Sequence, residues 1–153
     1  MTQQPSIGKD ALLGHRFALE IAGIEQASFQ ECTGLQIQTE VFEYKEGGLN
    51  SYSHRLPGRT TYSNVTLKWG STDSPDLLDW YNNLITAEKK VDAKRHVSII
   101  QYDGKPNEVR RWNLKFAYPV KWVGPSFNAA TSALSIETLE LAFSEFEFKP
   151  GKA

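Results

Sequence analysis

The segment Arg111–Val123 constrains the fold more than any other part of the chain, because its apolar residues recur at every second position. The even positions hold Trp112, Leu114, Phe116, Tyr118, Val120 and Trp122. The odd positions are mainly charged, polar or small. Such alternation is typical of a long β-strand with one face toward a core. Pro119 cannot donate a ladder hydrogen bond, so it predicts an edge or a bulge at that point.

Shorter runs with extended patterning occupy much of the remaining chain. They cover 16–22, 27–31, 35–42, 65–69, 97–102 and 133–148. The apolar phase of the last run shifts twice, which predicts β-bulges near Thr138 and Ser144. Together with 12% aromatic residues, these runs favour a mainly β fold. The longest stretch without clear periodicity, Lys45–Asn64, is predicted to be a loop, and a loop of this length is usually functional or disordered.

A single segment has helical spacing. Ser74 supplies an N-cap, Pro75 takes the first helical position and Asp76 places a carboxylate in the first turn. An apolar stripe follows, formed by Leu77, Leu78, Tyr81, Leu84 and Ile85. The sequence therefore predicts one helix, Pro75–Ala87, that packs this stripe against the strands.

Length and charge limit the organisation and the partners. The 153 residues predict one domain at 16–153, preceded by an N-terminal arm at 1–15. Lys and Arg number 17 and Asp and Glu 18, for a net charge of -1. This balance argues against nucleic-acid binding and leaves little repulsion between copies of the chain. No stretch approaches the roughly 20 apolar residues of a membrane helix, and the start lacks the pattern of a signal peptide.

The residues that carry chemistry do not form a familiar motif. There is no P-loop, dinucleotide fingerprint, two-histidine metalloprotease motif or Cys-x-x-Cys pair. The histidines lack ligand spacing: His15, His54 and His96. Carboxylates repeat every third residue at the start of the helix: Asp73, Asp76 and Asp79. They are interpreted as a charge-biased first turn rather than a cation or acid–base site.

The remaining candidates are a thiol and a row of aromatic side chains. Cys32 is a nucleophile only if a base lies nearby, and its place in a strand favours a small buried residue. The aromatic side chains of the Trp112 strand would stack on bases or sugars if they faced outward, but alternation favours a core face. The sequence thus predicts no catalytic residue, no cofactor and no metal.

Several short segments carry a more specific signal when they are taken together in order. They are Phe29–Leu35, Glu43–Gly48, Leu56–Gly58, Asn64–Gly70, Leu78–Trp80 and Glu137–Ala142. This combination closely resembles the inner tube proteins of contractile phage tails and of related extracellular contractile injection systems, over about Phe17–Phe148. The family usually has Val-Ser where this chain has Cys32-Thr33, and often Arg at the position of Trp69. These departures leave the subfamily open.

The resemblance implies a β-barrel-like subunit of two packed antiparallel sheets with one flanking α-helix. Such subunits form six-membered rings that stack into a tube inside a contractile sheath, with cargo or DNA in the channel. The implied partners are further copies of the chain, a sheath protein, baseplate or tube-initiating proteins, a terminal cap and a cargo effector in the lumen. The implied setting is the bacterial cytoplasm during assembly and then a phage tail or a phage-tail-like or bacteriocin-like particle.

The resemblance also assigns roles to residues. The stretch from Tyr44 onward becomes a ring-stacking element, with the interface residues Tyr44, Lys45, Glu46, Gly47, Gly48, Leu49, Asn50, Leu56, Pro57, Gly58 and Arg59. On the long strand, Trp112, Leu114 and Phe116 are expected to face the subunit core. The alternate residues are expected to face water in the lumen: Arg111, Asn113 and Lys115. The polar face of the helix is expected to point toward the sheath or a neighbour.

Three other functions compete with this interpretation. The tube protein of the type VI secretion apparatus shares the fold, although the Glu-Gly-Gly and Leu-Pro-Gly segments favour the phage-tail-like branch. A β-barrel enzyme binding a flavin or another small ligand would need polar groups that converge on a pocket. A nucleic-acid-binding barrel conflicts with the balanced charge, so no specific nucleic-acid binding is predicted.

Overall fold

The computed structural model describes residues 16–22, 24–48, 53–70, 76–103, 107–130 and 135–151. The predicted arm at 1–15 lies outside these ranges. The elements are β1 (Arg16–Ile21), β2 (Ile24–Phe29), β3 (Glu31–Thr33), β4 (Ile37–Tyr44), β5 (His54–Tyr62), β6 (Val65–Gly70), α1 (Asp76–Thr86), the 3-10 helix η1 (Lys90–Ala93), β7 (Arg95–Tyr102), β8 (Glu108–Val123), β9 (Ile136–Ala142) and β10 (Glu145–Pro150). The predicted mainly β fold with one α-helix is confirmed.

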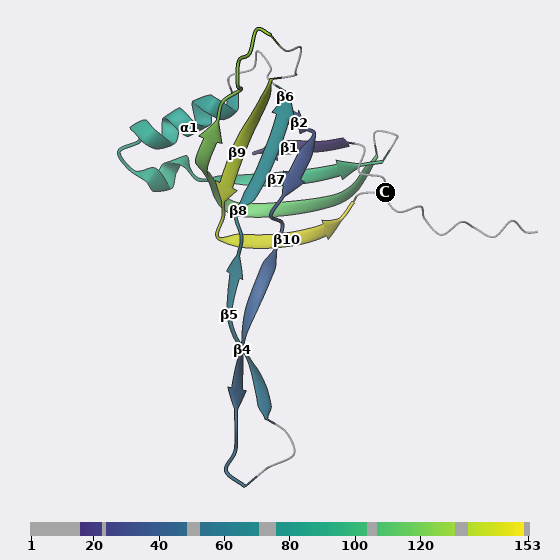
Figure 1. Cartoon of the computed structure of the whole chain (residues 1–153), viewed down its shortest axis with the longest axis vertical. Helices are drawn as coiled ribbons and strands as arrows, with labels where there is room; N and C mark the ends of the chain where they lie inside the picture. The colour runs from purple at the N-terminus through teal and green to yellow at the C-terminus, as the bar shows by residue number, and fades with distance from the viewer. Residues whose placement is uncertain are drawn as a thin grey trace, which may run out of the picture.

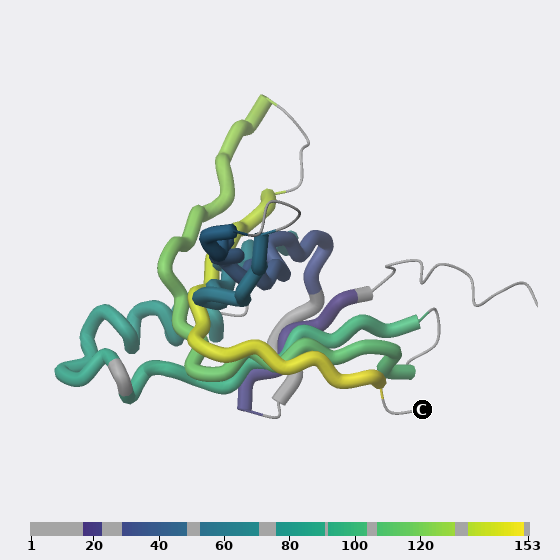
Figure 2. The backbone as a smooth tube through the Cα atoms, turned by 90° about the horizontal axis from the view of Figure 1, so that it is seen from below, coloured from purple at the N-terminus to yellow at the C-terminus, as the bar shows by residue number. Residues whose placement is uncertain are grey.

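Eight strands form an antiparallel sheet that folds over on itself at β8. The strand order is β2-β1-β7-β8-β9-β6-β3, and β10 also pairs with β8. Up to Ala117, β8 pairs with β7 and β10, whereas from Tyr118 onward it pairs with β9. The strands β2, β1, β7, the first part of β8 and β10 follow one another in a first layer. The end of β8 with β9, β6 and β3 forms a second layer (Figures 1 and 2). The implied pair of packed antiparallel sheets is present.

The fold-over point of β8 lies at Phe116. This residue has a φ of 56°, which is a strained backbone conformation for a bulky side chain. It stands between the last residue paired with β10, Lys115, and the first paired with β9, Tyr118. The Phe116 ring is 44% exposed and lies 5.2 Å from the ring of His96. The prediction that Phe116 faces the core is therefore wrong, because the strand changes layer at this residue.

Of the three predicted bulges, the structure contains the one at Pro119. The register of β8 against β9 shifts between Pro119 and Lys121, which confirms a bulge at the proline. Strand β9 pairs with β6 without interruption from Ile136 to Leu141, so the bulge expected near Thr138 is absent. At Ser144 the chain does not bulge but passes from β9 to β10.

The core lies between the two layers. The first layer contributes Leu19, Val97, Ile99 and Leu114, and the second contributes Val65, Leu67, Leu139 and Leu141, all fully buried. Trp112 and Trp122 pack against this cluster, as the alternation of their strand predicts.

The face of α1 that packs against the core differs from the predicted apolar stripe. Its buried residues are Leu77 and Trp80, and the indole Nε1 of Trp80 donates a hydrogen bond of 2.8 Å to the Ala93 carbonyl. Ile85, predicted to lie in the buried stripe, is 63% exposed. The helix therefore leaves part of its apolar stripe uncovered.

The two remaining strands, β4 and β5, pair with each other and project from one end of the body (Figure 1). Every residue of β4 is exposed. The predicted loop Lys45–Asn64 is wrong for residues 54–62, which form β5. The strand was missed because its sequence shows no apolar alternation and contains Pro57 and Gly58, which are typical of turns.

Candidate assembly surfaces

The β4–β5 hairpin carries apolar side chains where nothing in its own chain covers them. Ile37, Val41, Phe42, Tyr44 and Leu56 remain between 51% and 60% exposed. An isolated two-stranded hairpin is at best marginally stable in water, and exposed apolar clusters usually mark contact sites. The hairpin is therefore a candidate contact element.

The structure brings the predicted stacking residues together on this one hairpin. Tyr44 ends β4, residues 45–48 follow it, and Leu56, Pro57, Gly58 and Arg59 lie within β5. Leu49 and Asn50 lie outside the described residues. The register shifts between Thr39 and Val41, which leaves one extra residue in β5 beside Gly58. A Cβ at Gly58 would overlap the Phe42 ring, so the Leu-Pro-Gly segment provides the space for that ring.

Three aromatic rings fix the base of the hairpin to the body. Tyr62 at the end of β5 lies 5.5 Å from the Phe143 ring and 6.5 Å from the Phe146 ring, measured between centroids. These phenylalanines flank the corner between β9 and β10. The Asn64 amide also donates a hydrogen bond of 2.7 Å to Glu140 of β9. The hairpin therefore leaves the body in a defined direction.

A second candidate surface is the outer face of the first layer, where Arg111 binds two carboxylates. Its Nη1 and Nη2 atoms donate to the two Glu20 oxygens at 2.8 and 3.2 Å. Its Nε and Nη2 atoms donate to Glu108 at 2.7 and 2.9 Å. These hydrogen bonds raise the pKa of Arg111 further above its ordinary value, which keeps the guanidinium charged. Arg111 is thereby held in place on this face.

The other two predicted lumen residues also have partners on neighbouring strands. Asn113 accepts a hydrogen bond of 2.7 Å from the Ser98 hydroxyl and donates one of 3.4 Å to Glu147. Lys115 pairs with Glu145 at 3.2 Å. The face is polar, and Arg111, Lys115 and Lys149 are each paired with glutamates that outnumber them. The glutamates that partner the three predicted residues were not predicted, although acidic residues at alternate positions of β10 mark its outer face.

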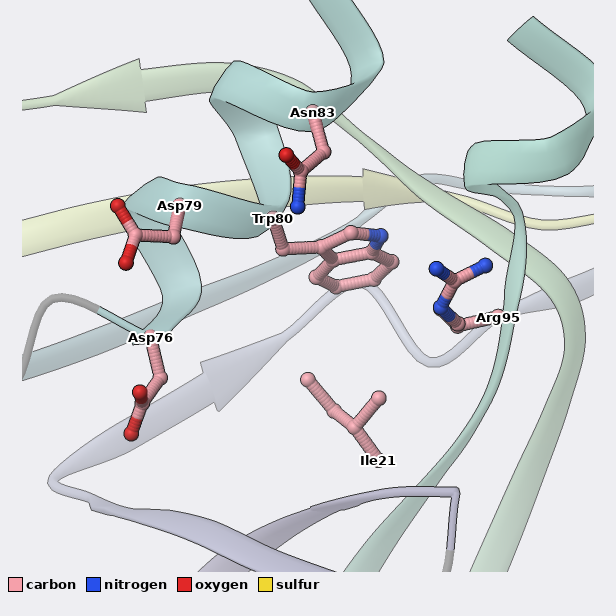
Figure 3. Close-up of a pocket in the computed structure, with 6 residues that line it drawn as sticks. All are labelled: Ile21, Asp76, Asp79, Trp80, Asn83 and Arg95. Atoms are coloured by element: carbon pink, nitrogen blue, oxygen red, sulfur yellow. The ribbon is translucent and has the colours of Figure 1, made fainter. Parts of the chain in front are cut away.

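A cavity of about 260 Å³ lies beside the start of α1. It is lined by Ile21, Asp76, Asp79, Trp80, Asn83 and Arg95. In Figure 3 the two carboxylates lie on one side of the Trp80 ring and the Arg95 guanidinium on the other. The Arg95 guanidinium donates a hydrogen bond of 2.6 Å to the backbone carbonyl of Asp92. Among the described residues, the lining contains no thiol, hydroxyl or imidazole, so these residues do not assemble a nucleophile with a base. Asp73 lies outside the described residues.

The histidines of the described ranges are not brought together. His54 lies on the hairpin, 3.9 Å from Glu46, and His96 stacks beside Phe116 on β7. His15 lies outside the described residues. Within the described part of the chain, no three His, Cys, Asp or Glu side chains are grouped closely enough to hold a metal ion. The same ranges contain no helix with the length and apolar character of a membrane span.

Cys32 is partly buried against the core, and this burial raises the pKa of its thiol from 9.0 to about 12. At pH 8 its reactive thiolate is therefore scarcer by on the order of a thousandfold than in an unburied thiol. We expect Ellman's reagent to label the native protein at least about a hundredfold more slowly than the urea-unfolded chain. Equal rates would show that Cys32 is a reactive group.

The raised pKa of Cys32 also makes the stability of the fold depend on pH. The unfolded thiol ionises above pH 9, whereas the folded thiol stays neutral up to about pH 12. Because ionisation favours the unfolded chain in this window, this group lowers the free energy of unfolding as the pH rises from 9 toward 12.

Comparisons with solved structures show which known proteins share this fold. The tube protein in a sheath-tube complex of an extracellular contractile injection system (PVC, extended state) superposes with a TM-score of 0.80 and 22% identity, covering 98% of this chain and 99% of that one. A chain of the anti-feeding prophage cap superposes with a TM-score of 0.76 and 20% identity, covering 98% and 94%. Hcp1 from Flavobacterium johnsoniae superposes with a TM-score of 0.53 and 16% identity, covering 89% of this chain and 96% of that one.

These likenesses concern the fold, whereas a sequence model identifies the family. No curated protein matches the chain in a direct sequence search. The model of the T4-like virus tail tube protein gp19 matches residues 13–147, which is most of the chain. The chain therefore belongs to the T4-like virus tail tube protein gp19 family.

Proposed function

We propose that the chain forms six-membered rings that stack into the inner tube of a contractile tail or injection system. The single observation that carries the stacking is the β4–β5 hairpin, which leaves the body with its apolar side chains uncovered. A neighbouring ring would bury these side chains. Residues 44–50 and 56–59 are assigned to this contact, and residues 16–153 act as one tube domain.

Sheet pairing between copies would close each ring. The first layer ends in β2 on one side and β10 on the other, and its described strands pair with nothing beyond these two. Open strand edges invite pairing with another chain, and closure of a sheet across copies removes them. The face carrying Arg111, Asn113 and Lys115 would then line the channel. Its internally paired charges suit a surface along which cargo or DNA slides without being held.

The other partners follow from the family. The similar structures include a sheath-tube complex and a tube-terminating cap. We assign a sheath, a cap and a baseplate or tube-initiating protein to this chain as well, with assembly in the bacterial cytoplasm before incorporation in the particle. The role is structural rather than enzymatic, and the α1 cavity supports this because it lacks a converging catalytic set.

The type VI secretion tube is the second candidate, because Hcp1 has the same fold. Superposition favours the phage-tail-like branch, with TM-scores of 0.80 against 0.53. Effectors captured by isolated rings, together with genes for a type VI apparatus beside this one, would favour the second candidate instead.

Electron microscopy of concentrated purified protein tests the proposal directly. We expect rings with six-fold symmetry and, with a tube-initiating component added, stacked tubes. Sedimentation measurements should show a species six times the monomer mass of 17.2 kDa. A monomer that persists with and without the initiating component would contradict the function.

The channel assignment has its own test in assembled tubes. The variant Lys115→Cys should react with a small maleimide but at least about tenfold more slowly with a long polyethylene-glycol maleimide, because the long reagent enters a narrow channel poorly. Asn82→Cys, on an exposed position of α1, is the matched control and should react with both reagents. Equal reaction of both variants with the long reagent would place Lys115 on the outside.

A further inference from the structure

A groove runs between the end of α1 and the free part of β8, with a volume of about 530 Å³. Its apolar walls include Leu84 and Ile85 on the helix and Val120 on the strand. At its floor the Tyr81 hydroxyl donates a hydrogen bond of 3.1 Å to the Val120 carbonyl, which ties the helix to the strand. Volumes of this size accommodate sizeable side chains or small ligands.

The fold of one copy does not fill this groove. Beyond Ala117, β8 pairs with β9 on one side and with no described strand on the other. Ile85 belongs to the apolar stripe of α1 yet remains 63% exposed. An apolar stripe that its own chain leaves uncovered points to contact with a second molecule.

The groove also carries positive charge. Its charged lining residues are Lys90 and Lys94, and the Lys94 ammonium lies 5.6 Å from the centre of the Tyr118 ring. Within the described part of the chain, no acidic residue lines it. The groove therefore suits a partner that presents apolar or aromatic side chains beside carboxylates.

One face of the β4–β5 hairpin has this combination. Phe42 lies opposite Leu56, and Tyr44 lies opposite His54, so these side chains share a face. Glu40 falls on the same face by alternation, and Glu46 lies 3.9 Å from His54. The opposite face carries Val41 opposite Pro57 and the pair of Glu43 with Arg55, so the carboxylate on that face already has a cationic partner. The Phe42 face thus matches the groove in apolar character and in charge.

The two surfaces are also placed for a head-to-tail contact. In Figure 1 the hairpin leaves the lower end of the body, whereas α1 and the free part of β8 lie in its upper half. The eight residues of β4 span about 25 Å, enough to reach into a neighbouring body. A contact between two different surfaces of the same chain either closes into a ring or continues as an open assembly, and between surfaces at opposite ends of the body it can continue as a stack.

We propose that the groove between α1 and β8 receives the Phe42 face of the hairpin from a second copy in the adjacent ring. The inference rests on the proposed tube and names its receptor site. Ile85 and Val120 cover the Phe42 and Leu56 side chains, and Lys90 and Lys94 lie near the hairpin carboxylates.

Cysteine cross-linking in the full-length chain tests the pairing. A sample mixing Leu56→Cys and Ile85→Cys proteins is assembled and treated with a short bismaleimide. We expect a heterodimer, identified by mass spectrometry, at a yield at least about tenfold above the controls. The controls are Arg55→Cys mixed with Ile85→Cys, Leu56→Cys mixed with Asn83→Cys, which lies on another side of α1 from Ile85, and the parent chain with Cys32 alone.

The outcomes separate this site from the function itself. Tubes that form without the Leu56–Ile85 cross-link, or with equal cross-linking in the controls, overturn the docking site and leave the tube function standing. In that case the groove remains for the sheath or another protein. A sample that forms neither rings nor tubes contradicts both proposals. A cross-link that appears in tubes but not in isolated rings supports the inference.

Discussion

A chain in which Asn-Gly replaces residues 41–58 is expected to fold and to form rings, yet to lose tube assembly. The replacement keeps the base of the hairpin, where the Thr39 and Thr60 hydroxyls are 2.9 Å apart, and closes it with a two-residue turn. Because the removed side chains are exposed in the single copy, the melting temperature should stay within about 3 °C of the parent. Without the apolar hairpin face, adjacent rings lose the contact that buries it.

The measurement is tube count and length by electron microscopy, with ring content followed by sedimentation. We expect at least a hundredfold fewer tubes at equal protein concentration. The matched control is Glu43→Gln with Arg55→Gln, which changes an exposed pair at 3.8 Å on the other hairpin face. Such pairs contribute little, so this variant should assemble normally. Normal tubes from the shortened chain would show that the hairpin is not the stacking element.

The substitution Gly34→Ala is expected to lower the free energy of unfolding by about 2 kcal/mol or more. Gly34 has a φ of 90°, and an added Cβ would overlap the carbonyl oxygen of Asn64. The backbones approach closely here because the chain leaves the body for the hairpin between β3 and β4. Both the positive φ and the overlap therefore oppose any side chain.

Two other glycines separate these effects in thermal melts. Gly48 has a φ of 103° but open space around it, so Gly48→Ala should show a smaller loss from backbone strain alone. Gly47 has open space and no positive φ, so Gly47→Ala should be nearly neutral. At about 2–4 °C per kcal/mol, Gly34→Ala should melt at least about 4 °C below the parent. If Gly34→Ala lowered the melting temperature least of the three variants, the close approach of the Gly34 and Asn64 backbones would be contradicted.

The parts predicted well from the sequence are those whose burial alternates along the chain. The long strand β8 and the helix α1 place one face toward a common core, so their periodicity records their structure. Trp112 and Leu114 face the core as expected. The same rule failed at Phe116, where the strand changes layer, and at Ile85, where the core is too small to cover the whole stripe.

The hairpin shows a second limit of prediction from the sequence. Its second strand was predicted to be a loop, because its apolar residues do not alternate and Pro57 and Gly58 lie within it. The segments Glu43–Gly48 and Leu56–Gly58 nevertheless predicted a contact element in this part of the chain through family resemblance, and the structure places both on the hairpin. Only the structure shows that Phe42, Leu56 and Tyr44 share one face.

By itself the sequence determined the mainly β class, the single helix and the family, because local periodicity and short ordered segments survive without knowledge of distant contacts. Tertiary structure alone decided which distant residues meet. Arg111 lies between Glu20 and Glu108, although Glu20 is 91 residues away in the chain. The groove between α1 and β8 likewise depends on how two elements pack. Such juxtapositions arise from long-range pairing of strands, which leaves no mark in the spacing of nearby residues.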